Sequence, residues 1–310
     1  MNANGLYNGL EGYIVPGTNS GMGMGVVNGA VSNDSNSKIK LLDKYPGAAV
    51  AYSFRKLSNN YNGPSIRVRR SNDNLEQDIF FDGNGDLDLS TLRSFVGSNS
   101  GFVSIWYNQS GISGRDFSQT IVGQQPVIVN SGIVVTSNLR PAIDFDGSLD
   151  NMVTAGQIIT TNNYSAFCVL RNDTPLNNCW ILSQSSSAGD PRLIIFSTPN
   201  SAPFDRVRTF VTSISSSSVT SISNITDNVL KILYAESAFN RVSIGVNGAI
   251  ENSEAVVSFT PINRPLGVGW NGAATPFFPG LISEIILYEP NVTGFKTGIE
   301  SDINQYYKIY

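Results

Sequence analysis

The sequence predicts an all-β protein, a jelly-roll β-sandwich with one short internal helix and a helix at the C-terminus. From Gly101 onward, short apolar or alternating runs are separated by turns rich in Gly, Asn and Ser, a pattern typical of sandwiches. Only 14% of the 310 residues are charged, so the polar surface must consist mostly of uncharged, turn-forming side chains. The apolar spacing becomes helical only near the end. We therefore predict one sandwich domain, residues 41–310, after an N-terminal arm, residues 1–40.

The predicted arm, residues 1–40, is rich in Gly and Asn, for example in the run from Gly21 to Gly25. Such a segment buries too little apolar surface to offset the entropy lost when it becomes ordered alone. Two supports are compatible with the sequence. A neighbouring subunit could hold the arm, which would make it an assembly element, or the arm could pack on its own domain.

The first strands are predicted from two alternating runs, Ala49 to Leu57 and Ile66 to Arg70, with turn residues Asn59 to Pro64 between them. Alternation on both sides of a turn predicts a β-hairpin. Arg67 and Arg69 lie on one face of the second run. We expect them to be structural, paired with the nearby acidic residues Asp73, Glu76 and Asp78.

A short internal helix is predicted from Leu89 to Val96, with Asp88 as its N-cap and Gly97 at its end. A calcium loop is the alternative, because four oxygen-bearing side chains precede the helix at alternate positions: Asp82, Asn84, Asp86 and Asp88. The sixth position of such a loop is Leu87 rather than Gly, and the twelfth is Arg93 rather than Glu. The turn and cap therefore fit better than calcium, and we expect no other cofactor.

The rest of the chain is predicted as short strands, with Asn247-Gly248 as a two-residue hairpin turn. Thr293 is the predicted N-cap of the C-terminal helix, in which Phe295, Ile299, Ile303 and Tyr306 share a face. The predicted strands are Phe102 to Tyr107, Pro126 to Val129, Gly132 to Val135, Pro141 to Phe145, Ser165 to Leu170, Trp180 to Ser183, Arg192 to Phe196, Arg206 to Thr212, Val219 to Ile222, Val229 to Ala235, Arg241 to Val246 and Ala255 to Phe259.

The composition excludes several kinds of chemistry. The chain has no histidine, which removes Ser-His-Asp and Cys-His catalysis and any His-ligated metal. The net charge of −4 gives no electrostatic case for nucleic acid. We expect no membrane insertion and no signal peptide, because no long apolar run is present and the N-terminus lacks a basic and apolar leader. A free core thiol is favoured for Cys168, although a disulfide with Cys179 stays open.

The stretch from Tyr45 to Asp116 carries the most specific pattern in the chain. It contains Ala51-Tyr52-Ser53-Phe54-Arg55-Lys56-Leu57, then Ile66-Arg67-Val68-Arg69-Arg70-Ser71, and then Trp106-Tyr107-Asn108-Gln109-Ser110-Gly111 followed by Gly114-Arg115-Asp116. This block resembles the opening of the arabinofuranosidase B catalytic domain and of concanavalin A-like, laminin-G-like domains in bacteriophage structural proteins. The resemblance covers about Leu42 to Gly147 and returns weakly at Gly280 to Tyr288. It implies a concanavalin A-like sandwich.

The resembling arabinofuranosidases are retaining enzymes that need two carboxyl groups about 5 Å apart. The region that corresponds to their nucleophile, Asn178 to Ser186, has one cysteine where the family has two and contains no glutamate. The loop that corresponds to their acid/base aspartate, Gly267 to Gly272, has no carboxylate, and Asn108 replaces a further aspartate of the family. The resemblance thus favours the fold and not the activity. Four other carboxylates could substitute, although we favour plain solvent-facing strand positions for them: Glu236, Glu284, Asp144 and Asp146.

These features together predict a non-enzymatic virion structural protein of a bacteriophage, such as a tail-fibre, head-fibre or capsid-decorating subunit. The arm would bind other virion proteins, and we expect a homo-oligomer, with a trimer favoured. The protein would be made in the cytoplasm of the bacterial host and assembled into the virion.

Two other functions are compatible with the same residues. One is binding of a host surface glycan, on the virion or as a free-standing carbohydrate-binding module. The other is an active arabinofuranosidase-type glycoside hydrolase. Aromatic and amide side chains are the candidate glycan-binding residues, because sugars stack on rings and hydrogen-bond to amides: Trp270, Asn271, Trp106, Tyr107, Asn108, Gln109 and Trp180.

Overall fold

The structure is a computed structural model that describes residues 39–310, apart from residues 173, 186–191, 213–215, 239, 256–258 and 270–275. The predicted arm, residues 1–40, lies outside the described residues except for Ile39 and Lys40. The described part is mostly β, and its strands form one large, largely antiparallel sheet that curves nearly into a barrel. The all-β prediction is confirmed at this level, and the jelly-roll connectivity stays a prediction.

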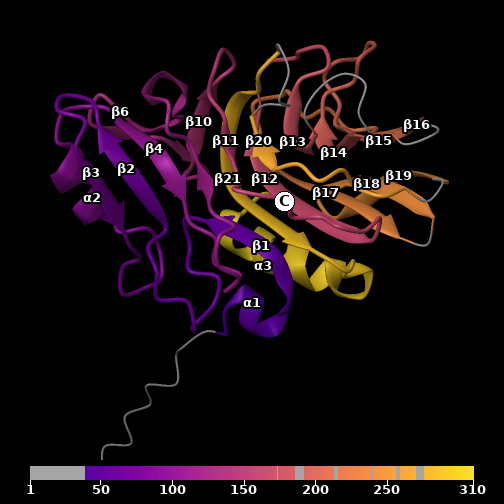
Figure 1. Cartoon of the computed structure of the whole chain (residues 1–310), viewed down its shortest axis with the longest axis horizontal. Coiled ribbons are helices and arrows are strands. Elements are labelled where there is room, and N and C mark those ends of the chain that lie inside the picture. The colour runs from indigo at the N-terminus through magenta and orange to yellow at the C-terminus, as the bar shows by residue number, and fades with distance from the viewer. Residues whose placement is uncertain are drawn as a thin grey trace, which may run out of the picture. The chain divides into compact units, whose positions relative to one another are not determined.

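The central strand is β21 (Pro279–Tyr288), which lies close to the C-terminal end of the sequence. β12 (Tyr164–Arg171) pairs with it along one edge. Two strands share the other edge, with β1 (Ala48–Ser53) at one end and β10 (Ile143–Asp146) at the other. Figure 1 shows β21, in yellow, beside the indigo β1. Three distant parts of the chain therefore meet on one strand.

The sheet continues from both sides of this centre. Beyond β12 lie β17 (Lys231–Ala238), β18 (Arg241–Val246) and β19 (Ala249–Ala255). Beyond β10 the pairing runs through β6 (Val127–Asn130), β4 (Gly101–Trp106), β2 (Ile66–Arg70) and β3 (Glu76–Ile79), with β7 (Ile133–Val134) beside β6.

A second layer of the sheet begins with a short strand that also pairs with β4. Its strands follow one another in the order β5 (Phe117–Ser118), β11 (Met152–Val153), β20 (Gly267–Val268), β13 (Trp180–Gln184), β14 (Arg192–Ser197), β15 (Arg208–Thr212) and β16 (Ser216–Thr220). A separate two-stranded sheet joins β8 (Thr136–Ser137) to β9 (Arg140–Pro141).

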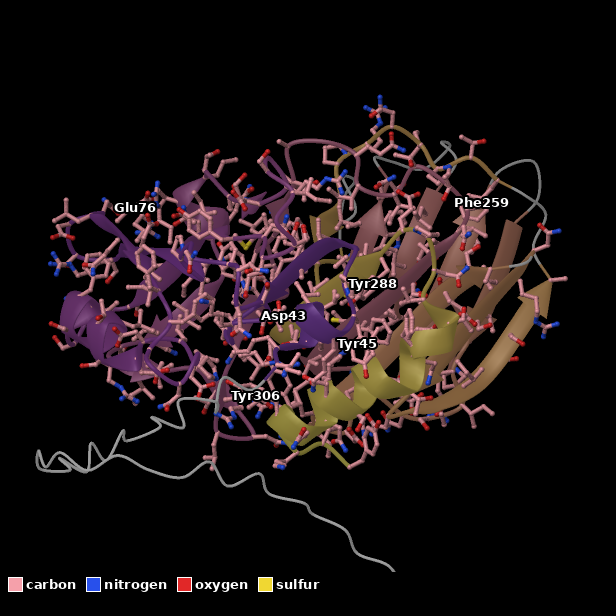
Figure 2. All side chains as sticks on the ribbon, turned by 90° about the horizontal axis from the view of Figure 1, so that it is seen from below. Asp43, Tyr45, Glu76, Phe259, Tyr288 and Tyr306 are labelled. Atoms are coloured by element: carbon pink, nitrogen blue, oxygen red, sulfur yellow. The ribbon has the colours of Figure 1, made fainter. Side chains whose placement is uncertain are left out.

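Successive side chains of β21 point to opposite faces, and both faces are buried. Ile285 and Leu287 belong to the main core between the layers. Ile286 and Tyr288 belong to a second core beneath α1 (Leu41–Lys44) and α3 (Lys296–Tyr307). Figure 2 shows this outer face, with α3 crossing the strands and α1 near Tyr45 and Tyr288. The remaining helical elements are α2 (Leu89–Val96), η1 (Val122–Gln124) and η2 (Thr293–Phe295).

The predicted hairpin between the first two runs is wrong. β1 pairs with β21, and β2 pairs with β3 and β4 instead. All six residues of β1 are buried, so this strand takes the most buried place available, beside the central strand. The turn residues between the runs carry the chain from one part of the sheet to another.

Several local predictions are confirmed. Asp88 caps α2 by accepting a hydrogen bond from the backbone N–H of Thr91. Asn247 and Gly248 form the β18–β19 turn with positive φ angles. Arg67 forms a two-pronged ion pair with Asp78, and Cys168 and Cys179 are both free and buried.

The start of the C-terminal helix differs from the prediction. The α-helix begins at Lys296, after η2, and its N-cap position has no side-chain hydrogen bond. The Thr293 hydroxyl donates instead to Glu236. Ile299 and Ile303 are buried as predicted, whereas Phe295 is exposed. No helix in the described ranges is both long and apolar enough to span a bilayer.

Candidate active site

Three carboxyl groups gather where β10 runs into the loop before β11. Asp144 and Asp146 lie two residues apart in β10 and therefore on one face of the strand. Asp146 Oδ1 accepts hydrogen bonds from the backbone N–H groups of Ser148, Leu149 and Asp150, at 2.7, 3.1 and 3.3 Å. Asp150 Oδ2 in turn accepts from the backbone N–H of Asp146 at 3.1 Å. The loop is closed by reciprocal bonds between the two aspartates.

The two aspartates of this loop differ in environment. Asp146 is exposed, whereas only 6% of Asp150 is exposed. Burial raises the pKa of Asp150 to about 7, and the negative charges of Asp146 and Asp144 raise that pKa as well. Asp150 therefore keeps its proton at a higher pH than an ordinary carboxyl group does. A carboxyl group that is still protonated near neutral pH can act as a general acid.

The neighbouring strands place the Asp150 loop against the second layer. β11, which follows the loop, pairs with β20, and β20 pairs with β13. Gly269 comes directly after β20 with a φ of +80°, and a β-carbon there would lie 2.8 Å from the Asp150 carbonyl oxygen. Only glycine allows this close approach, which brings Asp150 next to the segment that the sequence matched to the acid/base loop of arabinofuranosidases.

Glu284, one of the predicted substitute carboxylates, is committed to a buried ion pair. Arg55 binds both of its carboxylate oxygens, with Nε–Oε2 and Nη2–Oε1 distances of 2.8 and 2.9 Å. Ser53 and Tyr307 donate to the same carboxylate. Only 1% of Glu284 is exposed, because α3 covers this face of β21. The geometry gives it a structural role.

Glu236 lies on the same outer face, also beneath the C-terminal segment. Its Oε2 accepts hydrogen bonds from the Tyr234 hydroxyl at 2.6 Å and from the Thr293 hydroxyl at 2.7 Å. Through the bond to Thr293, Glu236 of β17 holds the segment that connects β21 to α3. Neither glutamate faces the Asp150 loop, which lies at the opposite end of β21, beside Pro279.

Of the predicted glycan-binding residues that the structure describes, two tryptophans lie in the core. Trp106 is fully buried and stacks on Phe54, with ring centroids 5.2 Å apart. Trp180 is also buried, and its indole N–H donates to Asn178. Trp270 and Asn271 lie outside the described residues.

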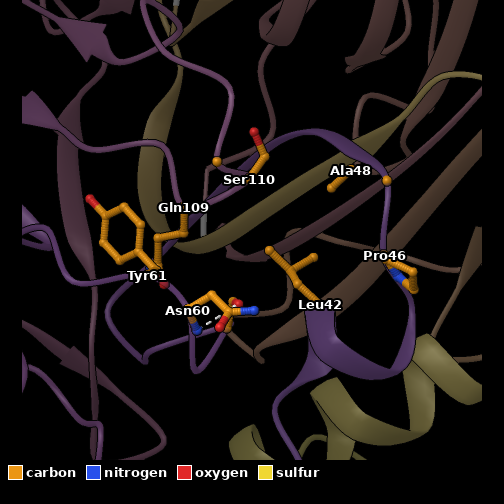
Figure 3. Close-up of a pocket in the computed structure, with 10 residues that line it drawn as sticks. Leu42, Pro46, Ala48, Asn60, Tyr61, Gln109 and Ser110 are labelled. Carbon is orange, nitrogen blue, oxygen red and sulfur yellow. Dashed lines mark hydrogen bonds between the residues drawn. The ribbon is translucent and has the colours of Figure 1, made fainter.

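The segment Tyr107 to Gln109 mainly supports β1 and the loop that follows it. The Tyr107 hydroxyl donates to Asp78 at 2.8 Å. Asn108 Oδ1 accepts from the backbone N–H of Ala51, and Gln109 Nε2 donates to the carbonyl oxygens of Ser53 and Arg55. Gln109 also lines a small pocket beside β1, shown in Figure 3.

The side chains of the calcium alternative have separate partners. Asp82 accepts from the backbone of Asn84 and Asp86 within its own turn, and Asp88 caps α2. Asp86 accepts from the Tyr306 hydroxyl and pairs with Arg140. Within the described ranges, no three acidic or cysteine side chains are placed to hold a metal ion together.

Comparisons with known proteins find the fold among solved structures. A mutant of a GH54 α-L-arabinofuranosidase soaked with 4-nitrophenyl α-L-arabinofuranoside is 14% identical, with a TM-score of 0.63, over 83% of this chain and 62% of that chain. An arabinofuranosidase complexed with arabinofuranosyl-α-1,2-xylobiose is 15% identical, with the same coverage and a TM-score of 0.61. A Trypanosoma rangeli sialidase in complex with sialic acid is 13% identical over 66% of this chain and 31% of that chain, with a TM-score of 0.46.

The other two comparisons are negative, since no family model matches the chain and no curated protein matches it. The chain spans about 62% of the length of the arabinofuranosidases that share its fold. Identities this low show a common fold alone. The resemblance to arabinofuranosidases is confirmed at that level.

The prediction of a non-enzymatic bacteriophage virion protein is wrong. The arabinofuranosidase structures that match this fold are glycoside hydrolases, and nothing in the comparisons indicates a phage, virion or fibre protein. The prediction rested on the resemblance of the opening block to phage domains, on the low-charge composition, on the Gly-rich arm and on the absence of carboxylates at two matched positions. Catalysis by two carboxyl groups requires both of them to flank the scissile bond, and different loops of one fold can supply them. Asp144 and Asp146 were among the predicted carboxylates, whereas Asp150 was not, although its spacing of four residues from Asp146 was an available signal.

Proposed function

We propose that this chain is a glycoside hydrolase of the arabinofuranosidase kind, with Asp150 as the general acid and Asp146 as the charged carboxylate. The observation that carries the proposal is a buried carboxyl group with a pKa raised to about 7, next to an exposed carboxylate on the same loop. The fold shared with arabinofuranosidases supports the same class of substrate.

The proposed chemistry follows from the two environments. The buried Asp150 retains its proton near neutral pH and donates it to the glycosidic oxygen as the bond to the leaving group breaks. The Asp146 carboxylate stabilises the positive charge that develops on the sugar ring, either as nucleophile or as the base that activates water. The anomer released first, followed by NMR, distinguishes retention from inversion and so assigns this second role.

The proposed substrate is an α-L-arabinofuranoside, the class bound in the arabinofuranosidase structures that share the fold. The experiment compares two such glycosides, one with the good leaving group 4-nitrophenol and one with methanol. Asp150→Asn should lower kcat/KM for the methyl glycoside about 100-fold or more. It should affect the 4-nitrophenyl glycoside much less, because 4-nitrophenolate leaves without help from an acid.

The control is Asp227→Asn, which removes an exposed carboxylate that pairs with Lys231 and accepts a hydrogen bond from the backbone N–H of Val229. It should leave both rates unchanged. If Asp150→Asn lowered kcat/KM equally for the two substrates, Asp150 would not be the general acid. Failure of the unaltered protein to cleave either glycoside, at any pH from 5 to 8, would overturn the proposed function.

A further inference from the structure

A pocket of about 230 Å³ lies beside the start of β1, far from the carboxyl groups. Four segments converge on it: the end of α1, the entry to β1, the turn around Asn60, and the loop from Gln109 to Gly111. Figure 3 shows their side chains around the opening. Its distance from the Asp150 loop follows from β21, since Ala48 pairs with Tyr288 and Asp146 pairs with Pro279. These two partners are nine positions apart along β21, which corresponds to about 30 Å of strand.

The lining of the pocket is neutral and has two kinds of surface. No charged side chain is among its lining residues, and its apolar part consists of Leu42, Pro46 and Ala48. The polar part includes the half-buried Tyr61 and the exposed Asn60. Within the described structure the side-chain amide of Asn60 has no hydrogen-bond partner, while its backbone N–H donates to Ser58. A donor and an acceptor are thus available at the mouth.

The polar wall is held rigidly by the rest of the fold. The Gln109 side chain accepts from Leu57 N–H and donates to two carbonyl oxygens of the β1 segment. The Ser110 hydroxyl accepts from the Asn108 side chain and donates to the Ala49 carbonyl oxygen. Tyr61 donates its hydroxyl to the Pro64 carbonyl oxygen. A site whose walls are fixed before binding loses little entropy when it captures a small ligand.

We propose that this pocket binds one ring of a neutral sugar, as a subsite separate from the carboxyl groups. A sugar ring has apolar C–H faces that suit the aliphatic wall and hydroxyl groups that suit the unpaired side-chain amide of Asn60. The volume is below the roughly 300 Å³ at which pockets for drug-sized ligands begin, so it fits a single ring rather than an oligosaccharide. Because the pocket has no cationic side chain among its lining residues, it provides no charge to attract an anionic ligand.

The test is an NMR titration of the full chain with L-arabinose and with D-galactose. We expect saturable shifts of the backbone amides of Gly47, Asn60 and Gly111, with a Kd on the order of 1 to 10 mM. Asn60→Leu should weaken binding about fivefold, the effect of losing roughly one hydrogen bond. Asn59→Leu is the matched control, because Asn59 is exposed and does not line the pocket.

Binding here is independent of hydrolysis, so Asp150→Asn should leave these shifts and the affinity unchanged even where it abolishes turnover. The proposal is overturned if neither sugar shifts the amides around the pocket, or if Asn60→Leu and Asn59→Leu bind equally. Shifts confined to the loop from Asp146 to Asp150 would also overturn it, since they would locate the only sugar site at the carboxyl groups.

Discussion

Asp146 and Asp150 are four residues apart in sequence, yet the fold gives their carboxyl groups different chemistry. Asp146 is exposed, and three backbone N–H groups satisfy one of its oxygens. Asp150 is buried and accepts one backbone hydrogen bond. A carboxyl group that must lose its proton in a buried place costs stability at neutral pH. Such a cost is typical of residues retained for function.

Asp150→Asn should therefore stabilise the protein at pH 8 and leave its stability nearly unchanged at pH 4. The pKa of Asp150 is about 7 in the folded protein, compared with 3.8 for an ordinary aspartate. The folded state thus holds the proton more tightly, and the stability that this gives is complete below pH 4 and is lost as the pH rises to about 7. Urea unfolding at both pH values should show a difference of about 2 to 4 kcal/mol at pH 8.

The control for that prediction is again Asp227→Asn, whose effect on the free energy of unfolding should not depend on pH in this way. A variant that is equally stable relative to the unaltered protein at pH 4 and pH 8 would mean that Asp150 ionises normally in the folded state.

Leu139 offers a second prediction at the scale of one residue. It lies at the tip of the β8–β9 hairpin with a φ of 62° and is 94% exposed. A left-handed conformation is costly for leucine and free for glycine. Leu139→Gly should raise the free energy of unfolding by about 0.5 to 1 kcal/mol. Leu139→Ala keeps the unfavourable φ and should give no gain; a gain of the same size from alanine would show that strain is not the cause.

At the scale of elements, one buried ion network joins β1, β21 and α3. Arg55 follows β1 and binds Glu284 of β21 and Asp302 of α3, each at 2.8 Å. Lys44 of α1 binds the other oxygen of Asp302. The helices that cover the outer face are thus attached to the central strand by charges as well as by apolar packing.

Glu284→Gln should destabilise the protein by about 3 to 5 kcal/mol, because it leaves the buried Arg55 without its main counter-charge. Thermal or urea unfolding measures this. Lys44→Ala removes a partly exposed member of the same network and should cost less than about 1 kcal/mol. Full stability of Glu284→Gln, together with loss of arabinofuranosidase activity, would move Glu284 from the structural network to the catalytic groups.

At the scale of the whole molecule, the sequence predicted those features that depend on neighbours in the chain. The Asn247-Gly248 turn and the Asp88 cap need only local chemistry, and both are confirmed. The pairing of β1 could not be predicted, because its partner lies more than 230 positions later and the pattern within a strand does not identify the strand that it pairs with.

The candidate site, too, could be predicted from the sequence only in part. Asp144 and Asp146 could be recognised as a carboxylate pair from their spacing. The spacing of Asp150 from Asp146 is visible in the sequence, but the raised pKa of Asp150 is not, because it depends chiefly on burial in the folded chain. The burial of Glu284 could not be predicted for a related reason. Alternation along β21 places its side chain on the outer face of the sheet, and α3 covers that face in the fold.

The place of β21 at the centre of the sheet has a consequence for biosynthesis. β1, β10 and β12 all need this strand as a partner, and it leaves the ribosome after every other strand of the sheet. The first 278 residues therefore carry three strands, β1, β10 and β12, each with an open edge until translation reaches Pro279. Because such edges can pair with other chains, we expect a fragment that ends before Pro279 to aggregate more readily than the full chain does.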